Sequence, residues 1–342
     1  MENKQELFEK APVWKAYFII SLPVVFSMLV TLIYNMVDTF FVSGTQNADL
    51  VAGVSQCTPL FMLMLALGDI FGLGGSSIIS RLFGQKDDAT AKNVSGFCFY
   101  AAIISGLIVT GLMFLFQTPI LKMLGATDAT VKYASQYYFF IAWGAPLIIL
   151  SLTPSNIIRT EGLALQSMIA SVAGSIVNIA LDPLFIFTFK MGAGGAALAT
   201  VMGYVLSDAL LIYYILKKST NLTVSVRHVK IKRQLATSVF LIGIPASLTN
   251  LMQSYNMTII NRYLIDYGSK AVAAMGIAMK VNMIIMMIMV GFAFGAQPLI
   301  GYSYGAKDNK RLQKIIRFDL LVEVGFSALA AVFIIIFAPQ LI

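Results

Sequence analysis

The stretch AYFIISLPVVFSMLVTLIYNMVDTFFVS, residues 16–43, decides the fold class of this chain. It contains a single charged side chain, Asp38, in an otherwise largely apolar run. About 20 apolar residues in a helix cross the ~30 Å hydrocarbon layer of a membrane, so this stretch is long enough to span it. The sequence therefore predicts a membrane-spanning helix near its N-terminal end.

Stretches of the same kind recur along all 342 residues. Hydrophobic residues make up 58% of the chain and charged residues 12%, whereas about a quarter of the residues in soluble domains are charged. This composition excludes a soluble enzyme and predicts an all-α polytopic membrane protein. We predict nine spans, at 16–43, 49–80, 94–118, 131–152, 164–188, 194–216, 236–264, 271–302 and 315–340.

Lysine and arginine lie mostly on one side of the predicted spans. With the N-terminus inside, 18 of the 24 basic residues fall at inner span ends, and only Lys122, Lys132, Lys190 and Lys270 fall at outer ends. Basic residues near span ends are retained in the cytoplasm, so we expect a cytoplasmic N-terminus. The net charge of +8 then reflects this retention and contact with membrane lipid, and nucleic acid is not an expected partner.

The chain repeats itself at a constant offset. Tyr34-Asn35-Met36 matches Tyr255-Asn256-Met257, and Gly84-Gln85-Lys86-Asp87 matches Gly305-Ala306-Lys307-Asp308. Because the offset spans six helices, an even number, both copies have the same orientation. This pattern predicts two parallel lobes related by an axis along the membrane normal, as in transporters that rock two halves about a central site.

The repeat also divides the chain. We expect an N-lobe with helices 1–6 at residues 1–218, a cytoplasmic linker at 219–235, and a partial C-lobe with helices 7–9 at 236–342. Copy two stops at the equivalent of position 121, so three helices of copy one have no counterpart. We therefore expect the sequence to be a piece of a twelve-helix protein.

Four polar side chains in the N-lobe form a candidate site for a coupling cation. Asp38, Asp182 and Thr200 each lie about six residues from an outer span end, roughly 9 Å deep in a helix. Asn178 lies one turn before Asp182 on the same helical face. These oxygen-bearing groups suit Na⁺, and two nearby carboxylates also suit a proton. The alternative is that Asn178 and Asp182 only hydrogen-bond neighbouring helices.

Two prolines and two further acids have structural interpretations. Pro23 and Pro183 lie within predicted spans, where each frees a carbonyl one turn earlier, so both are candidate hinges. Asp69 and Asp208 lie nearer the inner ends of their spans. We predict that each is solvated or salt-bridged.

Candidate substrate contacts lie in both lobes. Met283 and Met287 share a helical face with Lys280, and flexible thioethers adapt to many ligand shapes. Lys280 could pair with an anionic group, repel a cationic substrate or partner an acid of the missing helices. The N-lobe would add Tyr34, Asn35 and Tyr138, which interhelical hydrogen bonding explains equally well.

Five motifs in register resemble the multidrug and toxic compound extrusion (MATE) transporters, and most closely their DinF- and MepA-like bacterial branch. They are Ser21-Leu22-Pro23 with the run 37–44, the Gly-x-Lys-Asp loops at 84–87 and 305–308, Arg159-x-Glu161-Gly162, Asn178 with Asp182-Pro183, and the run 194–200.

The resemblance covers the whole chain and implies twelve helices in two lobes. It also implies an antiporter that works by alternating access and exports lipophilic, often cationic drugs in exchange for Na⁺ or H⁺. The family's cation site falls on the positions of Asp38, Asn178, Asp182 and Thr200. Another branch has an acid in the seventh helix, where this chain has Gln253, Asn256 and Asn261, so a second cation site in the C-lobe is not expected.

An enzyme is not expected. Gly72, Gly74 and Gly75 lie inside a span and not after a strand, and the sequence has no Walker motif. We expect no cofactor besides the coupling ion, and a monomer that binds small lipophilic or cationic substrates. The alternative is a lipid or polyisoprenoid flippase, whose cavity should carry several basic residues for a pyrophosphate group. For such a cavity the chain offers only Lys280 and Arg262, against two or three acids.

Overall fold

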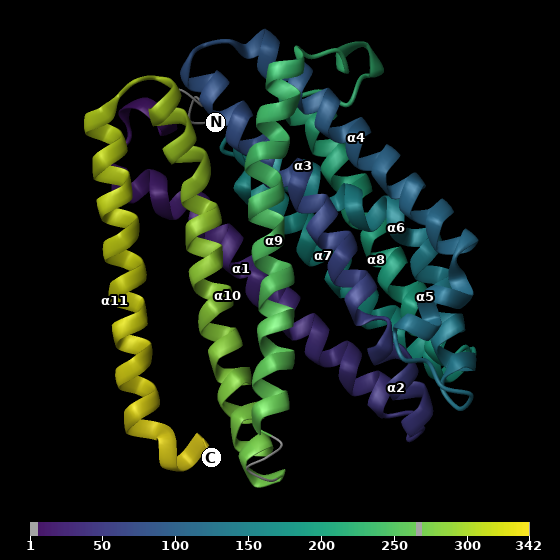
Figure 1. The fold of residues 1–342 in the computed structure, drawn as a ribbon. Helices are drawn as coiled ribbons and strands as arrows, with labels where there is room; N and C mark the ends of the chain where they lie inside the picture. Colours follow the sequence, from purple (N-terminus) through teal and green to yellow (C-terminus); the bar gives the residue numbers. More distant parts are fainter. Residues whose placement is uncertain (1–5, 265–268, 342) are drawn as a thin grey trace.

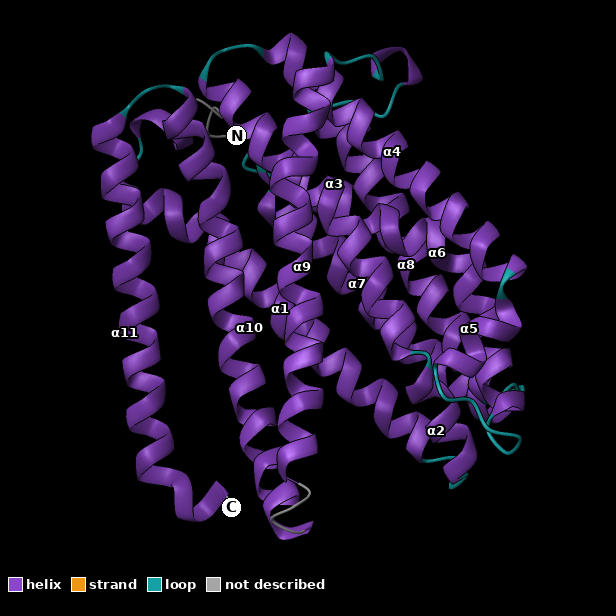
Figure 2. Cartoon of the chain, in the orientation of Figure 1, coloured by secondary structure: helices purple, strands orange, loops and turns teal. Residues whose placement is uncertain are grey.

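The computed structural model describes residues 6–264 and 269–341; most side chains between 249 and 277, and those from 337 onward, lie outside that description. All regular secondary structure in the described part is helical (Figure 2). Eight described helices are long and apolar enough to cross a membrane, which confirms the predicted all-α membrane fold. The remaining predicted span, 236–264, lies on helix α9, many of whose side chains are outside the description.

The helices follow the predicted spans with two additional breaks. The predicted second span is divided at Cys57, because Pro59 begins a new helix in the first turn, where its missing N–H is tolerated. The predicted third span ends in a separate short helix. The N-lobe helices are α1 (Val13–Ser43), α2 (Ala48–Gln56), α3 (Thr58–Gly84), α4 (Asp88–Leu115), α5 (Gln117–Met123), α6 (Val131–Arg159), α7 (Ala164–Pro183) and α8 (Ala193–Lys218).

Three further helices belong to the C-lobe: α9 (Arg233–Leu264), α10 (Ser269–Gly305) and α11 (Asn309–Leu341). The lobes meet through α1 against α10 and α3 against α9 and α10. Helix α11 lies at the edge and packs mainly on α10 (Figure 1). Between α8 and α9, the linker docks on α4, where the His228 ring nitrogen lies 2.9 Å from the Asn93 side-chain oxygen.

The repeated Gly-x-Lys-Asp motif makes the same turn in both lobes. Lys86 and Lys307 adopt left-handed backbone conformations, with φ of 63° and 58°. The Asp87 carboxylate then accepts a hydrogen bond from the Thr90 N–H, and Asp308 accepts one from the Arg311 N–H, both at 3.0 Å. The motif is therefore a tight turn with a helix N-cap.

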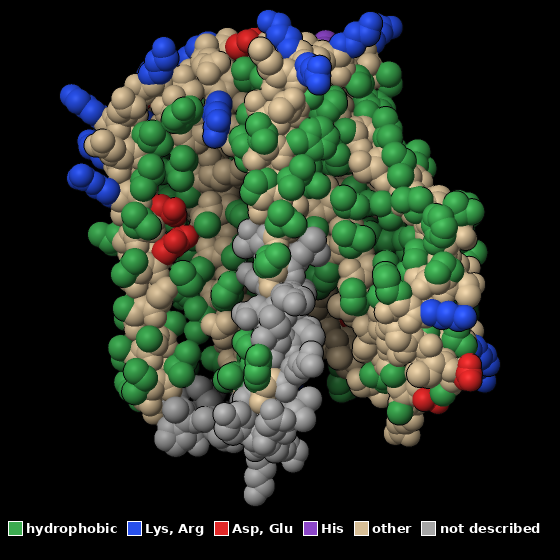
Figure 3. Space-filling view, viewed as in Figure 1, with side chains coloured by type: hydrophobic (Ala, Val, Ile, Leu, Met, Phe, Trp, Pro, Cys, Tyr) green, Lys and Arg blue, Asp and Glu red, His purple; other side chains and the backbone are tan. Residues whose placement is uncertain are grey.

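The two lobes close at the end of the molecule that carries these turns. We call it the basic end, because lysine and arginine gather there in Figure 3. A Cβ at Gly84 would lie 2.1 Å from the Tyr302 carbonyl oxygen, and one at Gly305 would lie 2.0 Å from the Arg81 carbonyl oxygen. The sequence repeat relates Gly84 to Gly305 and Arg81 to Tyr302, so each contact is the repeat equivalent of the other. The two contacts therefore lie around a pseudo-twofold axis between the lobes.

Toward the opposite end the lobes part. Among the described glycines of α10, Gly291 is the one furthest toward the opposite end; a Cβ there would lie 2.8 Å from the Val25 Cα. Beyond it, α1 and α2 diverge from α9 and α10 (Figure 1), and the face in Figure 3 is hollowed between the lobes. The structure is thus closed at the basic end and open at the other.

The N-terminal turn Glu6–Lys10 fastens the basic end. Glu9 forms an ion pair with Lys86 of the N-lobe and accepts a hydrogen bond at 2.6 Å from the Tyr302 hydroxyl of the C-lobe. Lys86 also donates to the Tyr302 hydroxyl at 3.0 Å. We call Glu9, Lys86 and Tyr302 the latch. It joins both lobes to the N-terminal segment.

The ionisation of the latch is insensitive to pH in the physiological range. The hydrogen bond between Lys86 and Glu9 lowers the pKa of Glu9. The same hydrogen bond raises the pKa of Lys86 to about 12. The stabilisation from Glu9 is lost only as the pH falls through that lowered pKa, and the stabilisation from Lys86 only as the pH rises through its raised one. The latch therefore keeps both charges across the physiological range.

Candidate functional site

The four side chains predicted as a cation site come together between α1, α7 and α8. We call them the cation cluster. The Asn178 amide donates to the Thr200 hydroxyl at 3.4 Å, and that hydroxyl donates to the Ala196 carbonyl at 3.1 Å. Asp38 lies within electrostatic range of Asp182, and Asn178, Asp182 and Thr200 are buried. Their proximity agrees with the sequence prediction, whereas cation binding remains a prediction.

The helix ends place these groups at one depth. Asp38 lies five residues before the end of α1, and Thr200 lies seven residues after the start of α8. Asp182 precedes Pro183, after which α7 continues as the π-helical turn Leu184–Thr188. At ~1.5 Å per residue, all three lie about 8–10 Å from the helix ends opposite the basic end.

Several buried oxygens in the cation cluster have no hydrogen-bond partner. They are Oδ1 of Asp38, Oδ1 of Asn178 and both carboxylate oxygens of Asp182. Buried polar atoms are normally paired, and an isolated buried carboxylate is costly. A set of acceptor oxygens without donors fits a positively charged partner, either a hard cation or a proton.

The cation cluster fits a transition metal less well than it fits a hard cation or a proton. In the described part of the chain, no group of three or more His, Cys, Asp or Glu side chains is placed to hold a metal ion. The cluster offers carboxylate, amide and hydroxyl oxygens, which prefer hard cations over the softer metals that imidazole and thiolate select.

Two tyrosines adjoin the cation cluster. Tyr34 lies beside Thr200 and Asp38, and Tyr137 lies within electrostatic range of Asp38 and Asp182. The predicted Tyr138 is instead fully buried, and its hydroxyl donates to the Met113 carbonyl at 2.6 Å, which ties α6 to α4. Neighbouring helical residues point about 100° apart, and the apolar pattern of 131–152 does not identify the face that turns toward α1.

The other predicted substrate contacts lie where the lobes part. Tyr34 and Asn35 follow Val25 along α1, and on α10 the residues Met287, Met283 and Lys280 lie beyond Gly291 toward the opposite end. Lys280 and Met283 are exposed, while Met287 is half-buried. Their role in substrate binding remains a prediction.

The structure separates Asp69 from Asp208. Arg159 is buried and lies within electrostatic range of Asp69, so a salt-bridged role fits Asp69. Asp208 is 2% exposed, and neither of its carboxylate oxygens has a hydrogen-bond partner. The prediction that Asp208 is solvated or salt-bridged is wrong, because α6 and α7 pack over the helix that carries it.

The sequence analysis missed two acids in α11. Asp319 accepts a hydrogen bond at 2.7 Å from the Tyr17 hydroxyl of α1, and Glu323 lies one turn further along α11. Both fall inside the predicted span 315–340. The criterion used for the N-lobe acids, an ionisable group within a span, would have selected them.

The predicted hinges have different surroundings. Helix α1 is continuous through Pro23, whose carbonyl accepts a hydrogen bond from the Ser27 hydroxyl at 2.9 Å. Pro183 is followed directly by the π-helical turn, a geometry common where helices bend. Bending at either proline remains a prediction.

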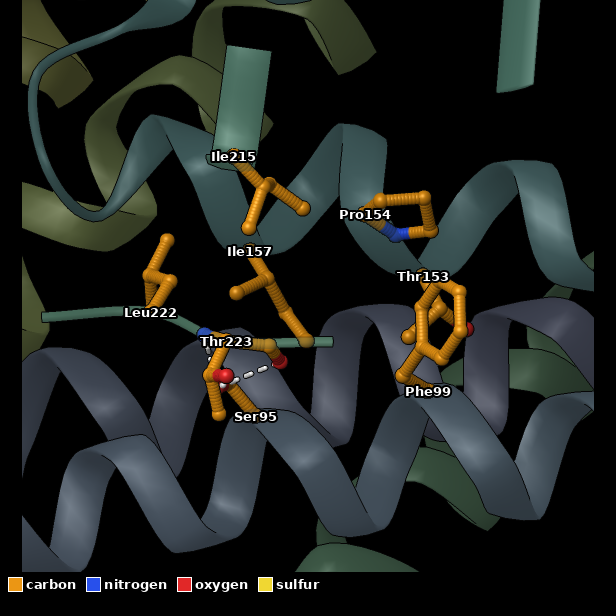
Figure 4. A pocket seen from close by; sticks show the side chains of 8 residues that line it. All are labelled: Ser95, Phe99, Thr153, Pro154, Ile157, Ile215, Leu222 and Thr223. Atoms are coloured by element: carbon orange, nitrogen blue, oxygen red, sulfur yellow. Dashed lines mark hydrogen bonds between the residues drawn. The ribbon is translucent and has the colours of Figure 1, made fainter. Parts of the chain in front are cut away.

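Two cavities in the described part of the chain are smaller than a drug-sized site. One, of about 10 Å³, lies where the linker meets α4, and Ser95 accepts a hydrogen bond there from the Thr223 N–H (Figure 4). Its volume suits about one water molecule. A second, of about 220 Å³, lies at the basic end between α3, α10 and α11 and is lined by Arg81 and Tyr304. Ligand pockets are usually about 300–1,000 Å³, so the opening between the lobes is the better candidate.

Comparison with known proteins agrees with this architecture. The MatE family model matches residues 23–184 and 245–342, two blocks that begin at Pro23 and Pro245. The "Multidrug export protein MepA" of Staphylococcus saprophyticus is 32% identical over 336 residues, which cover 98% of this chain and 74% of that protein.

Solved structures agree as well. A structure described as "MATE in the straight conformation" has a TM-score of 0.93 at 29% identity and covers 99% of this chain and 76% of that one. A multidrug resistance MATE family transporter in an "outward-facing conformation" has a TM-score of 0.91 at 29% identity and covers 100% and 75% of the two chains. The chain therefore belongs to the MATE family of membrane transporters and is not an enzyme.

Proposed function

We propose that this protein exports lipophilic, often cationic compounds in exchange for Na⁺ or H⁺ by alternating access. The observation that carries the proposal is the set of unpaired buried oxygens on Asp38, Asn178 and Asp182. A transporter that must bind and release a cation needs acceptors that its own donors do not satisfy. The similarity to the multidrug export protein MepA supports a small-molecule cargo.

The arrangement of the helices suggests how ion and cargo are linked. Asp38 lies on α1, whereas Asn178, Asp182 and Thr200 lie on α7 and α8. A cation or proton bound among them would draw α1 toward the other two helices and change the space beside Tyr34 and Asn35. Ion and cargo would then compete through a shift between two conformations of α1, and each would weaken the binding of the other by the same factor.

The direct test uses purified protein in liposomes. An imposed Na⁺ or H⁺ gradient should drive a lipophilic cationic dye such as ethidium against its own gradient, and collapse of the ion gradient should stop it. If neither gradient moves the dye while pyrophosphate-linked lipid is translocated, the flippase alternative replaces the antiporter.

We further propose that the basic end faces the cytoplasm of a bacterial plasma membrane. The basic residues that gather there in Figure 3 support this orientation. Single cysteines at Lys86 and Lys230 should be protected from a membrane-impermeant thiol reagent in intact cells, and a cysteine at Lys190 should be labelled. The native Cys57 and Cys98 are buried, so the parent provides the background. Labelling of Lys86→Cys from outside would contradict the orientation.

Pro23 should act as the hinge of α1. Proline frees the carbonyl one turn earlier and makes bending easier, and alanine restores that hydrogen bond. We expect Pro23→Ala to leave dye affinity within about twofold while turnover falls about five- to tenfold, corresponding to roughly 1–1.4 kcal/mol of added barrier. Binding by fluorescence anisotropy and transport in liposomes separate the two effects. Unchanged turnover would remove Pro23 from the mechanism.

A further inference from the structure

Asp208 is, besides Asp182, a buried carboxyl of the described N-lobe with no hydrogen-bond partner on either oxygen. It lies on α8, is 2% exposed, and neither carboxylate oxygen has a hydrogen-bond partner. An ionised carboxylate in such a position carries a large desolvation penalty, whereas a carboxylic acid is neutral and avoids most of it. The latch, the cation cluster and the inter-lobe opening do not use this side chain.

The helices around Asp208 bring no compensating charge to it. Helices α6, α7, α2 and α1 and the turn Leu184–Thr188 pack on α8; the turn has no titratable group, and that of α2 is the acid Asp49. The titratable group of α7 is Asp182, which lies at its far end, and α1 contributes Tyr34 and Asp38 at the level of the cation cluster. At the basic end of α6, the Arg159 guanidinium donates to the side chains of Ser155, Asn156 and Ser167.

The outer half of α6 carries Lys132, Tyr133, Tyr137 and Tyr138. Of the described titratable groups, the one that interacts with Asp208 is the Tyr204 phenol on the same helix. Asp208 therefore faces a hydroxyl and no cation.

One stripe of α8 connects Asp208 to the cation cluster. Thr200, Tyr204 and Asp208 are spaced four residues apart, so they lie on successive turns of the same face, about 6 Å apart along the axis. Tyr204 also lies within electrostatic range of Tyr34 and Tyr137, the two tyrosines that adjoin Asp38. Hydroxyl groups thus occupy the space between the two acidic positions.

Close packing joins α7 to α8. A Cβ at Gly203 would lie 2.8 Å from the Gly174 carbonyl oxygen, and one at Gly174 would lie 2.6 Å from the Gly203 carbonyl oxygen. Helices α7 and α8 therefore meet backbone to backbone at Gly174 and Gly203, five residues before Asp208. A hard metal cation takes about six or more oxygen ligands, which an isolated carboxyl does not supply, whereas a proton needs only one.

We infer that Asp208 is a second proton-binding group of the N-lobe, neutral in this conformation and connected through Tyr204 to the cation cluster. One proton binds the Asp208 carboxylate to give the acid, and one proton leaves when the N-lobe opens that region to water. This inference rests on the proposed antiport function. It extends that function by assigning H⁺ to Asp208, whether the cation cluster takes Na⁺ or H⁺.

Infrared difference spectroscopy of the purified protein tests the inference. A protonated carboxyl has a carbonyl-stretch band that a carboxylate lacks. At neutral pH we expect Asp208→Asn to lose one such band, and Asp208→Glu to keep it at a shifted frequency. The exposed Asp128→Asn is the matched control and should leave the band unchanged. An undiminished band in Asp208→Asn would overturn the inference.

The pH profile of transport supplies a second readout. We expect Asp208→Asn to flatten the dependence of dye efflux on pH, with dye affinity within about twofold of the parent, while Asp128→Asn keeps the parent's profile. A purely structural role for Asp208 would lower efflux at every pH and leave the profile unchanged, and that result would also overturn the inference. Failure of every ion gradient to drive efflux in the unmodified protein would instead refute the antiport function, and the infrared band would still report on Asp208.

Discussion

Asp182→Asn is expected to abolish ion-driven efflux while the protein remains folded. The amide keeps the shape of the side chain but removes the charge that a cation or proton must neutralise. Both Asp182 oxygens lack a donor in this structure, so the substitution breaks no hydrogen bond. The new amide N–H₂ can even donate to unpaired oxygens nearby. We therefore expect dye efflux to fall to the level of cells without the protein, with a melting temperature equal to or above the parent's.

The control is Asp128→Asn, which removes an exposed acid of the same lobe. It should leave both efflux and melting temperature unchanged, because an exposed carboxylate without a buried partner contributes little. Full resistance of Asp182→Asn cells to ethidium-like dyes, at equal expression, would show that Asp182 is only structural.

Gly305→Ala is expected to prevent the lobes from closing at the basic end. The new Cβ would lie 2.0 Å from the Arg81 carbonyl oxygen, a backbone atom that no rotamer change can move. Overpacking of this kind costs about 1–3 kcal/mol, which would lower the population of the closed arrangement about 5- to 150-fold. Transport should fall by a similar factor, and cysteines near Tyr302 should become accessible from the basic end.

The matched control is Gly325→Ala in the neighbouring helix α11, where a Cβ would meet nothing within 4 Å. Gly84→Ala should reproduce the defect, because the sequence repeat relates Gly84 to Gly305 and its Cβ would lie 2.1 Å from the Tyr302 carbonyl oxygen. Normal transport by Gly305→Ala would mean that this contact is not part of the cycle.

The fold could be predicted because membrane spans depend on local composition. Apolar runs of sufficient length specify helices whatever their neighbours, and the internal repeat specifies the relation of the lobes. The break at Cys57 was missed although its signal, Pro59, was present. The span 49–80 was assigned from the length of its apolar run, which covers both α2 and α3.

The cation cluster could be predicted because depth along a helix follows from counting residues. Asp38, Asp182 and Thr200 share one depth, Asn178 lies one turn deeper, and the structure places the four together. Counting does not give the rotation of each helix about its axis. Counting therefore could not decide between substrate contact and interhelical hydrogen bonding for Tyr138, and the prediction that Asp208 is solvated or salt-bridged was wrong. Each depends on which face of a helix its neighbours cover, and pairwise packing decides that.

The latch could not be predicted from sequence. Glu9 and Tyr302 are separated by 293 residues and come from segments with no shared pattern. Their contact exists only because the lobes close at the basic end. Contacts of this kind depend on the conformation, so sequence periodicity carries no signal for them.

Binding of a fluorescent lipophilic cation to the purified protein, titrated with Na⁺ and separately with acid, tests the central claim most directly. We predict that at least one of the two ions weakens dye binding in the unmodified protein, and that Asp38→Asn reduces this antagonism, because Asp38 is the member of the cation cluster on α1. Dye affinity that neither ion changes in the unmodified protein would contradict the account.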